Sequence, residues 1–282
     1  MSAVVLTSAL PPRRRSWTLL VGLVLVSVVV ATALVSLVWL PFDPSDTSGT
    51  RLEGPNATHW LGTDKLGRDL ATQLMIGARI ALTVGLGSVA VGAVIGISVG
   101  LLAAFAASWL DDTISAALDV VIAFPVLLLA MLIVAAQGAS LGSVILAIGL
   151  AMSAIVARLT RVLTKRVLGE QFVTAARTSG TRWPGIVARH ILPNIWPTLS
   201  VNLALQFGVA VLAEASLSYL GLGAPPPNAS WGRLLQEAQG TVVTAPVGAI
   251  APGLALVALV IGVNFVADGL RDVADPSRRR SR

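Results

Sequence analysis

The chain has 282 residues, of which 55% are hydrophobic and only 12% are charged, and its mean hydropathy is +0.82. Soluble domains carry about 25% charged residues, so this composition excludes a water-soluble globule and indicates an integral membrane protein. A net charge of +6 can indicate a nucleic-acid partner, but a nucleic-acid site needs a polar surface to carry its basic residues. This chain has too little polar surface, so we expect no nucleic-acid partner. Because cysteine is absent, disulfides and thiolate metal sites are excluded.

The first apolar segment covers residues 17–40 and follows Arg13, Arg14 and Arg15. An Ala-Thr-Ala triplet at residues 31–33 resembles a signal-peptide cleavage site. However, the apolar run is longer than the roughly 7–15 residues of a signal-peptide core, and it continues past the triplet. We therefore predict a retained membrane span.

Further segments have the length and apolarity of membrane-spanning helices, which need roughly 17–25 residues. Within hydrocarbon only a helix satisfies all backbone groups of such a segment. The predicted fold class is all-α integral membrane with six transmembrane helices, at residues 17–40, 80–107, 116–136, 141–157, 195–213 and 247–266.

Small residues recur every four positions along the second predicted span. Such a ridge lets two helix backbones approach closely in lipid, so we expect it to face another helix. The ridge consists of Ser88, Gly92, Gly96, Gly100 and Ala104.

Basic residues give the orientation. If the N-terminus is cytoplasmic, fifteen of the twenty Lys and Arg residues lie inside, which favours both termini in the cytoplasm. The turn-rich segment 41–79 is then outside and the segment 158–194 inside. We divide the chain into residues 1–78, with the first span and outer loop, and a core of residues 79–282, with five spans.

Catalytic and cofactor signatures are missing from the sequence. No G-x-x-x-x-G-K-[ST] loop is present to hold nucleotide phosphates, so we expect no ATPase activity and no cofactor in this chain. His59 and His190 fall on opposite sides of the predicted membrane and cannot share a metal ion. No convergent set of groups supports a membrane-embedded enzyme.

Few polar groups lie within or beside the spans, namely Asp119, Glu214 and a stripe on the fifth span. The stripe contains Asn202 and Gln206, four residues apart, with Ser216 near the same face. It either lines a translocation pathway or makes a hydrogen-bonded helix contact. We interpret Glu214 as a structural or interfacial group. A proton-coupled carrier would need more ionisable groups.

The inner segment 158–194 has helical periodicity. Leu168, Phe172 and Ala175/Ala176 share one face of a short predicted helix, and Gly180 suits the left-handed residue that ends it.

A second short helix is predicted after this glycine, with Thr181 as its cap and Pro184 in its first turn. Trp183, Ile186/Val187 and Ile191 form its apolar stripe, and Pro193 is expected to stop it. Two amphipathic helices of this kind lie on lipid or dock into a soluble partner.

The inner loop also resembles a known motif, the EAA loop of binding-protein-dependent ABC importer permeases. The residues that carry the resemblance are Val173-Thr174-Ala175-Ala176-Arg177-Thr178-Ser179-Gly180 and His190-Ile191-Leu192-Pro193-Asn194. Three other segments are similar to signatures of the C-type permease of the peptide/nickel branch. They are residues 59–69, residues 214–223 with Ser230-Trp231-Gly232, and residues 268–272 with Asp275-Pro276.

The resemblance implies a heterodimer of two related permeases, with ABC ATPase subunits beneath it and an extracytoplasmic substrate-binding protein above it. ATP and magnesium would be bound by the ATPases. The inner loop would couple to an ATPase through Thr174, Ala175, Ala176, Arg177, Gly180, Arg182, Trp183, Ile186 and Pro193. Trp183 or Ile186 would be the central anchor. Thr174 replaces the acidic residue that names the motif, so a salt bridge from that position is not expected.

The expected function is therefore translocation of di- or oligopeptides across the cell membrane by alternating access. Nickel, glutathione or another small solute is the alternative cargo. A proton-coupled secondary transporter is the alternative from another class.

Overall fold

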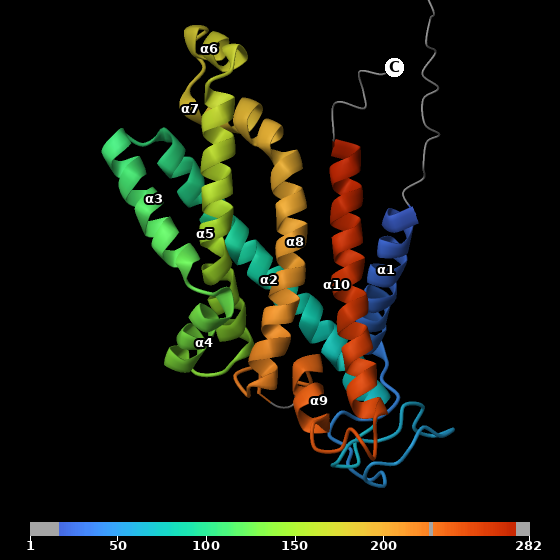
Figure 1. The fold of residues 1–282 in the computed structure, drawn as a ribbon. Coiled ribbons are helices and arrows are strands. Elements are labelled where there is room, and N and C mark those ends of the chain that lie inside the picture. Colours follow the sequence, from blue (N-terminus) through green and yellow to red (C-terminus); the bar gives the residue numbers. More distant parts are fainter. Residues whose placement is uncertain (1–16, 226–227, 275–282) are drawn as a thin grey trace, which may run out of the picture.

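The computed structural model describes residues 17–225 and 228–274 (Figure 1). Predictions made for Arg13–Arg15, for Asp275-Pro276 and for the last four arginines lie outside these residues. The described segments form helices joined by loops. In chain order they are α1 Trp17–Val38, α2 Leu70–Phe105, α3 Ser108–Ala123, α4 Val126–Gln137, α5 Leu141–Leu168, α6 Gln171–Thr178, α7 Trp183–Ile186, the π-helical η1 Val187–Ile191, α8 Leu192–Tyr219, α9 Trp231–Ala238 and α10 Val247–Ala274.

The long helices form an elongated bundle with two different ends (Figure 1). α5 and α8 stand in the middle, α1 and α10 lie together on one flank, and α3 and α4 occupy the other flank. α2 crosses the bundle diagonally and packs against α5 over the largest helix–helix contact. We call the end with α6 and α7 the inner end, and the end with residues 39–69 and α9 the outer end, following the predicted orientation.

Within the described residues, five helices are each long and apolar enough to cross a membrane, and the bent pair of α3 and α4 would make a sixth span if it crosses as one unit. The five helices are Trp17–Val38, Leu70–Phe105, Leu141–Leu168, Trp183–Tyr219 and Val247–Arg271. These helices overlap five of the six predicted spans, of which the first and second run two residues past the ends of α1 and α2. The chain is a multi-pass membrane protein.

The third predicted span, 116–136, is not one straight helix. α3 and α4 meet at an angle of 90° between Ala123 and Val126. Phe124 and Pro125 have extended backbone there, with ψ values of 132° and 129°. Proline has no N–H to continue the helix and disfavours helical geometry in the residue before it. The third predicted span is therefore bent, and α3 and α4 together have the length and apolarity of one broken span.

α2 begins ten residues earlier than the predicted span at residue 80. The side chain of Asp69 caps the helix by accepting a hydrogen bond of 2.7 Å from the Thr72 backbone N–H. The first residues of α2, from Leu70 to Gln73, are buried by protein. Hydropathy detects only the apolar part of such a helix, which explains the difference. The predicted division between residues 78 and 79 falls inside α2.

The ridge of small residues on α2 faces α5, as predicted. Ser88, Gly92, Gly96 and Gly100 are all buried, and Ser88 Oγ donates a 3.3 Å hydrogen bond to the Ile145 carbonyl on α5. A Cβ added at Gly100 would lie 2.5 Å from the Ala157 carbonyl oxygen and 2.6 Å from the Thr160 Cβ. Only glycine permits this helix–helix distance.

Candidate functional site: the inner loop

The inner loop leaves the bundle between α5 and α8 and contains α6, α7 and η1 (Figure 1). α5 continues beyond its predicted end at residue 157 to Leu168, so the loop projects from the end of a long helix. The loop is thus held at both ends by helices of the membrane bundle.

Gly180 ends α6 in the conformation that the sequence predicts, with φ of +82°. The Gly180 N–H donates to the Arg177 carbonyl, and the Thr181 N–H donates to the Ala176 carbonyl, each at 3.0 Å. This pair of bonds is the Schellman arrangement that closes a helix C-terminus. No atom lies within 4 Å of a Cβ built at Gly180, so glycine is required by the backbone angle and not by lack of space.

The cap predicted at Thr181 is not present. Its N–H is committed to α6, and α7 is preceded by Arg182, which makes no side-chain cap hydrogen bond. Pro184 does occupy the first turn of α7, as expected.

Pro193 does not stop the second helix, which corrects the prediction. The five residues Val187–Ile191 are π-helical and lead directly into α8, with Pro193 in the first turn of α8. A first-turn proline is tolerated because it needs no intrahelical N–H bond there. The second loop helix and the fifth span are consequently one helical path from Trp183 to Tyr219.

A compact apolar cluster supports the loop from within. Val173 of α6, Ile186 of α7 and Ile191 of η1 are each 1% exposed or less, and they pack with Val156, Ile195 and Leu199 of the bundle. Ile186 is therefore unavailable as an anchor for a partner, contrary to its assignment among the coupling residues. It stabilises the loop from inside, which leaves Trp183 as the exposed alternative.

The buried face of α6 also differs from the predicted one. Leu168 belongs to α5, because the helix is interrupted at Gly169 and Glu170. Val173 is buried, whereas Phe172 is 42% exposed, with its ring centroid 6.1 Å from that of His190.

Trp183 occupies the outer surface of the loop and is 44% exposed. Its ring meets Phe105, the last residue of α2, edge-on with centroids 4.8 Å apart. The guanidinium carbon of Arg177 lies 4.7 Å from the Trp183 ring centroid, a cation–π distance. These two contacts orient the indole while leaving much of it exposed.

Most of the other predicted coupling residues are also exposed. Thr174, Ala175, Arg177, Gly180, Arg182 and Pro193 are exposed, and Ala176 is half-buried. The loop thus presents a basic surface with an aromatic centre on an apolar support.

The residues of the predicted polar stripe on α8 differ in burial and in hydrogen bonding. Gln206 is buried and Asn202 is half-buried, and no hydrogen-bond partner reaches Asn202 Oδ1 or Gln206 Nε2 in the described part of the chain. Ser216 Oγ donates to the Leu212 carbonyl of its own helix at 2.8 Å. Glu214 is 2% exposed and accepts a 2.7 Å bond from Ser218 Oγ, as expected for a structural group.

An ion-pair cluster that the sequence did not reveal lies beside the inner loop. Asp111 of α3 is buried and binds Arg161 of α5 through two bonds, Nε–Oδ1 at 2.5 Å and Nη2–Oδ2 at 2.7 Å. Lys165 contacts the same carboxylate. A second pair, Asp119–Arg158 at 3.1 Å, is 59% exposed on both sides. α3 is thus fastened to the segment of α5 that carries the loop.

Residues 59–69, which carry one of the signatures, connect the outer loop to α9 through ion pairs. His59 Nδ1 lies 3.1 Å from Asp69 Oδ1, and Arg68 bridges Asp64 at 2.6 Å to Glu237 of α9 at 2.7 Å. Nearby, the hydroxyl and N–H of Ser45 donate to Asp43 and hold the pKa of that carboxyl below its usual value.

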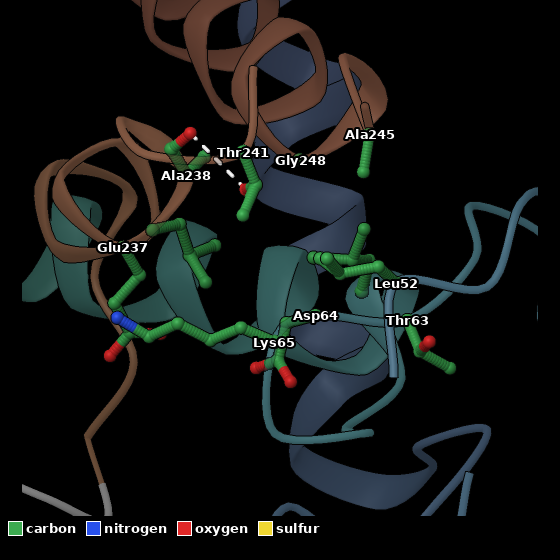
Figure 2. Close-up of a pocket in the computed structure, with 11 residues that line it drawn as sticks. Leu52, Thr63, Asp64, Lys65, Glu237, Ala238, Thr241, Ala245 and Gly248 are labelled. Carbon is green, nitrogen blue, oxygen red and sulfur yellow. Dashed lines mark hydrogen bonds between the residues drawn. The ribbon is translucent and has the colours of Figure 1, made fainter. Parts of the chain in front are cut away.

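A small pocket lies where this outer loop meets the segment between α9 and α10 (Figure 2). Thr63, Asp64 and Lys65 come from the loop, while Glu237 and Thr241 belong to the opposite wall, where Thr241 Oγ1 donates to the Ala238 carbonyl at 3.3 Å. Its small volume, about 20 Å³, and the surrounding ion pairs fit an anchoring role.

α9 was not predicted. Ser230 caps it by accepting from the Arg233 N–H at 3.3 Å, and Trp231 Nε1 donates to the Leu74 carbonyl at 3.0 Å. The signal was present in the sequence, because a capping serine is followed by apolar residues at helical spacing, Trp231, Leu234 and Ala238.

Comparison with known proteins identifies the class. The family model described as the binding-protein-dependent transport system inner membrane component matches residues 92–280. The chain belongs to this family. It is therefore the permease component of an ABC transport system, and its role is transport across the membrane rather than catalysis.

Three individual relatives have names that state what they transport. The chain is 36% identical to the dipeptide transport system permease protein DppC of Alkalihalophilus pseudofirmus, over 92% of this chain and 86% of the relative. It is 39% identical to a putative peptide transport system permease protein of Brucella suis, over 98% and 92%. It is 41% identical to the glutathione transport system permease protein GsiD of Pectobacterium atrosepticum, over 79% and 74%.

The fold also has a counterpart among solved structures. A chain of the MetNI methionine ABC transporter in an inward-facing conformation superposes with a TM-score of 0.61. The match covers 72% of this chain and 96% of that chain at 21% identity, and it supports the permease fold.

Proposed function

We propose that this chain is the second permease of an importer for di- or oligopeptides. In this assembly it pairs with a homologous permease, two ABC ATPase subunits that bind ATP and magnesium, and an extracytoplasmic substrate-binding protein. The peptide cargo is supported by the relatives from A. pseudofirmus and B. suis, which match nearly the whole chain. Membership of the ABC permease family argues against the proton-coupled alternative.

The observation that carries the proposed mechanism is the exposed loop surface around Trp183, mounted on a buried cluster continuous with α8. An ATPase that binds this surface differently in its two nucleotide states would shift the permease between its conformations. Both termini and the inner loop would then be cytoplasmic, and the Asp64–Arg68–Glu237 end would face the binding protein.

The test is reconstitution of the complete importer in proteoliposomes with its own binding protein. Uptake of labelled di- and tripeptides that depends on ATP and on the binding protein is expected. Uptake of glutathione alone would favour the second candidate, which the 41% identity to the glutathione permease supports. ATP-independent uptake driven by a proton gradient would contradict the proposal.

A further inference from the structure

An apolar groove runs along the bundle where α1, α2, α8 and α10 meet. It is open to the surroundings and has a volume of about 580 Å³. Its outer end is formed by Leu37, Arg79 and Thr83, and its deep end by Val26, Val89 and Val263. Exposed leucines border it, with Leu37 61% and Leu86 62% exposed.

Among the described residues, Arg79 is the only charged one that lines this groove. It is half-buried, and it makes no ion pair within the part of the chain that the structure describes. A guanidinium at the edge of hydrocarbon is costly unless an anion or water compensates it. Thr83 is the other polar residue on the groove wall, and its hydroxyl donates a 2.8 Å hydrogen bond to the Arg79 backbone carbonyl rather than contacting the guanidinium.

The level of Arg79 in the membrane follows from the aromatic residues at the end of α1. Trp39 lies directly after α1 and pairs with Trp60, with centroids 6.2 Å apart. Tryptophans gather at the membrane–water interface. The Phe42 N–H donates to Thr72 Oγ1 at 3.1 Å, so the end of α1 lies beside the start of α2. Arg79 lines the groove together with Leu37, which lies two residues before Trp39, so Arg79 is near the membrane interface.

The length of the groove matches one leaflet. From Leu37 to Val26 along α1, or from Arg79 to Val89 along α2, a helix rises about 15 Å at 1.5 Å per residue. Half of a typical hydrocarbon core is also about 15 Å. An acyl chain whose headgroup lies at Arg79 would end at the deep wall formed by Val26 and Val89.

We propose that this groove binds one anionic phospholipid of the outer leaflet. The guanidinium of Arg79 holds the phosphate through charge-assisted hydrogen bonds, and an acyl chain packs between α1 and α2 against Phe207. An anionic lipid is favoured over a zwitterionic one because its headgroup carries no ammonium group to cancel the phosphate charge. The lipid would fill the space between the first span and the rest of the bundle.

The test uses the complete purified importer in nanodiscs with equal amounts of phosphatidylglycerol and phosphatidylcholine. Native mass spectrometry then measures the lipids that remain bound. The wild type is expected to retain phosphatidylglycerol, and Arg79→Gln is expected to lose about tenfold of that preference, as the loss of one charge-assisted contact implies. Arg51→Gln, an exposed outer arginine, is the matched control and should retain the wild-type preference. Equal retention by the wild type and Arg79→Gln would overturn the proposal.

A second measurement covers the case in which Arg79→Gln does not assemble. A photo-crosslinking residue at Leu86, on the rim of the groove, should give an adduct with phosphatidylglycerol. An adduct with the second permease would show that the groove is a subunit interface. That outcome, or the absence of a lipid adduct, would contradict lipid binding.

Discussion

Trp183 of the inner loop and Phe105 at the end of α2 are in edge-to-face contact, with ring centroids 4.8 Å apart. They are far apart in sequence, and the contact connects the loop to the helix that crosses the whole bundle. The loop is therefore connected to α2 through this contact as well as to α5 and α8 through the chain.

Trp183→Ala should abolish peptide uptake and uncouple ATP hydrolysis from the binding protein. Buried aromatic anchors carry much of the energy of an interface, and this ring also loses its contacts with Phe105 and Arg177. Substrate-stimulated ATPase activity in proteoliposomes is the measurement. Trp196→Ala removes a tryptophan of similar exposure, 53%, from α8 outside the loop, and should retain coupling. Wild-type coupling in Trp183→Ala would rule out the loop as the ATPase contact.

Gly180→Val should impair coupling by distorting the end of α6. A β-branched residue at a φ of +82° costs roughly 1–2 kcal/mol, whereas Gly180→Asn should be tolerated better because asparagine adopts this region more readily. Gly169→Ala is the control, since Gly169 has an ordinary helical φ of −76°. A chymotrypsin-sensitivity assay of the loop, combined with uptake, measures the effect. Equal protease sensitivity in the valine and alanine variants would contradict it.

Thr174→Ala should be much milder than either change. The Thr174 side chain is exposed, and its carbonyl, which a substitution leaves in place, accepts the bond from Thr178 at 3.3 Å. Uptake within about twofold of wild type is expected; a loss as large as that of Trp183→Ala would mean that the hydroxyl contacts the partner.

Asp111→Asn should destabilise the attachment of α3 to α5 by roughly 1.5–3 kcal/mol, the value of hydrogen bonds to charged groups. Asp119→Asn, which disrupts the exposed pair with Arg158, should cost less than 1 kcal/mol. Thermal unfolding of the purified complex measures both. Exchanging the charges in Asp111→Arg/Arg161→Asp should recover part of the lost stability. An equal shift of the unfolding temperature in Asp111→Asn and Asp119→Asn would contradict the prediction that the buried pair stabilises more than the exposed pair.

Gly100→Ala should weaken the α2–α5 contact, because the added methyl meets the Ala157 backbone at 2.5 Å. Overpacking of this kind costs about 1–3 kcal/mol. Gly142→Ala, whose Cβ has only one neighbour at 3.9 Å, is the control. Heat-induced aggregation of the detergent-solubilised complex should occur earlier only for Gly100→Ala.

Hydropathy and small-residue spacing predicted most of the bundle. The ridge from Ser88 to Gly100 faces α5, and Gly180 has the expected left-handed backbone. These features depend on local sequence, where periodicity and backbone preference act directly. The basic-residue asymmetry gives an orientation that remains a prediction.

The two prolines show why other parts were missed. Pro125 breaks the third span at 90°, but an averaged hydropathy does not register one missing N–H. Pro193 was expected to end a helix, yet the π-helical turn before it places it in the first turn of α8. The outcome at Pro193 depends on how Ile191 and Ile195 pack, which is a tertiary property.

The site was predicted only in part, because part of it also depends on tertiary packing. The exposed loop residues follow from the motif resemblance, but the burial of Ile186 requires knowledge of which helices surround it. The Asp111–Arg161 pair joins residues 50 positions apart. No single-sequence pattern connects such residues.

The helical path from Trp183 to Tyr219 connects the inner loop directly to the outer end of α8. At about 1.5 Å per residue the 37 residues of this path measure roughly 55 Å, and its far tip lies at the outer end. That tip carries Glu214 and Ser218, next to the turn that leads into α9. The π-helical turn Val187–Ile191 and Pro197 both lie within this path, and helices bend at such features. Part of a rotation imposed at Trp183 would therefore be absorbed there, and the rest would pass along α8 to the opposite mouth of the permease.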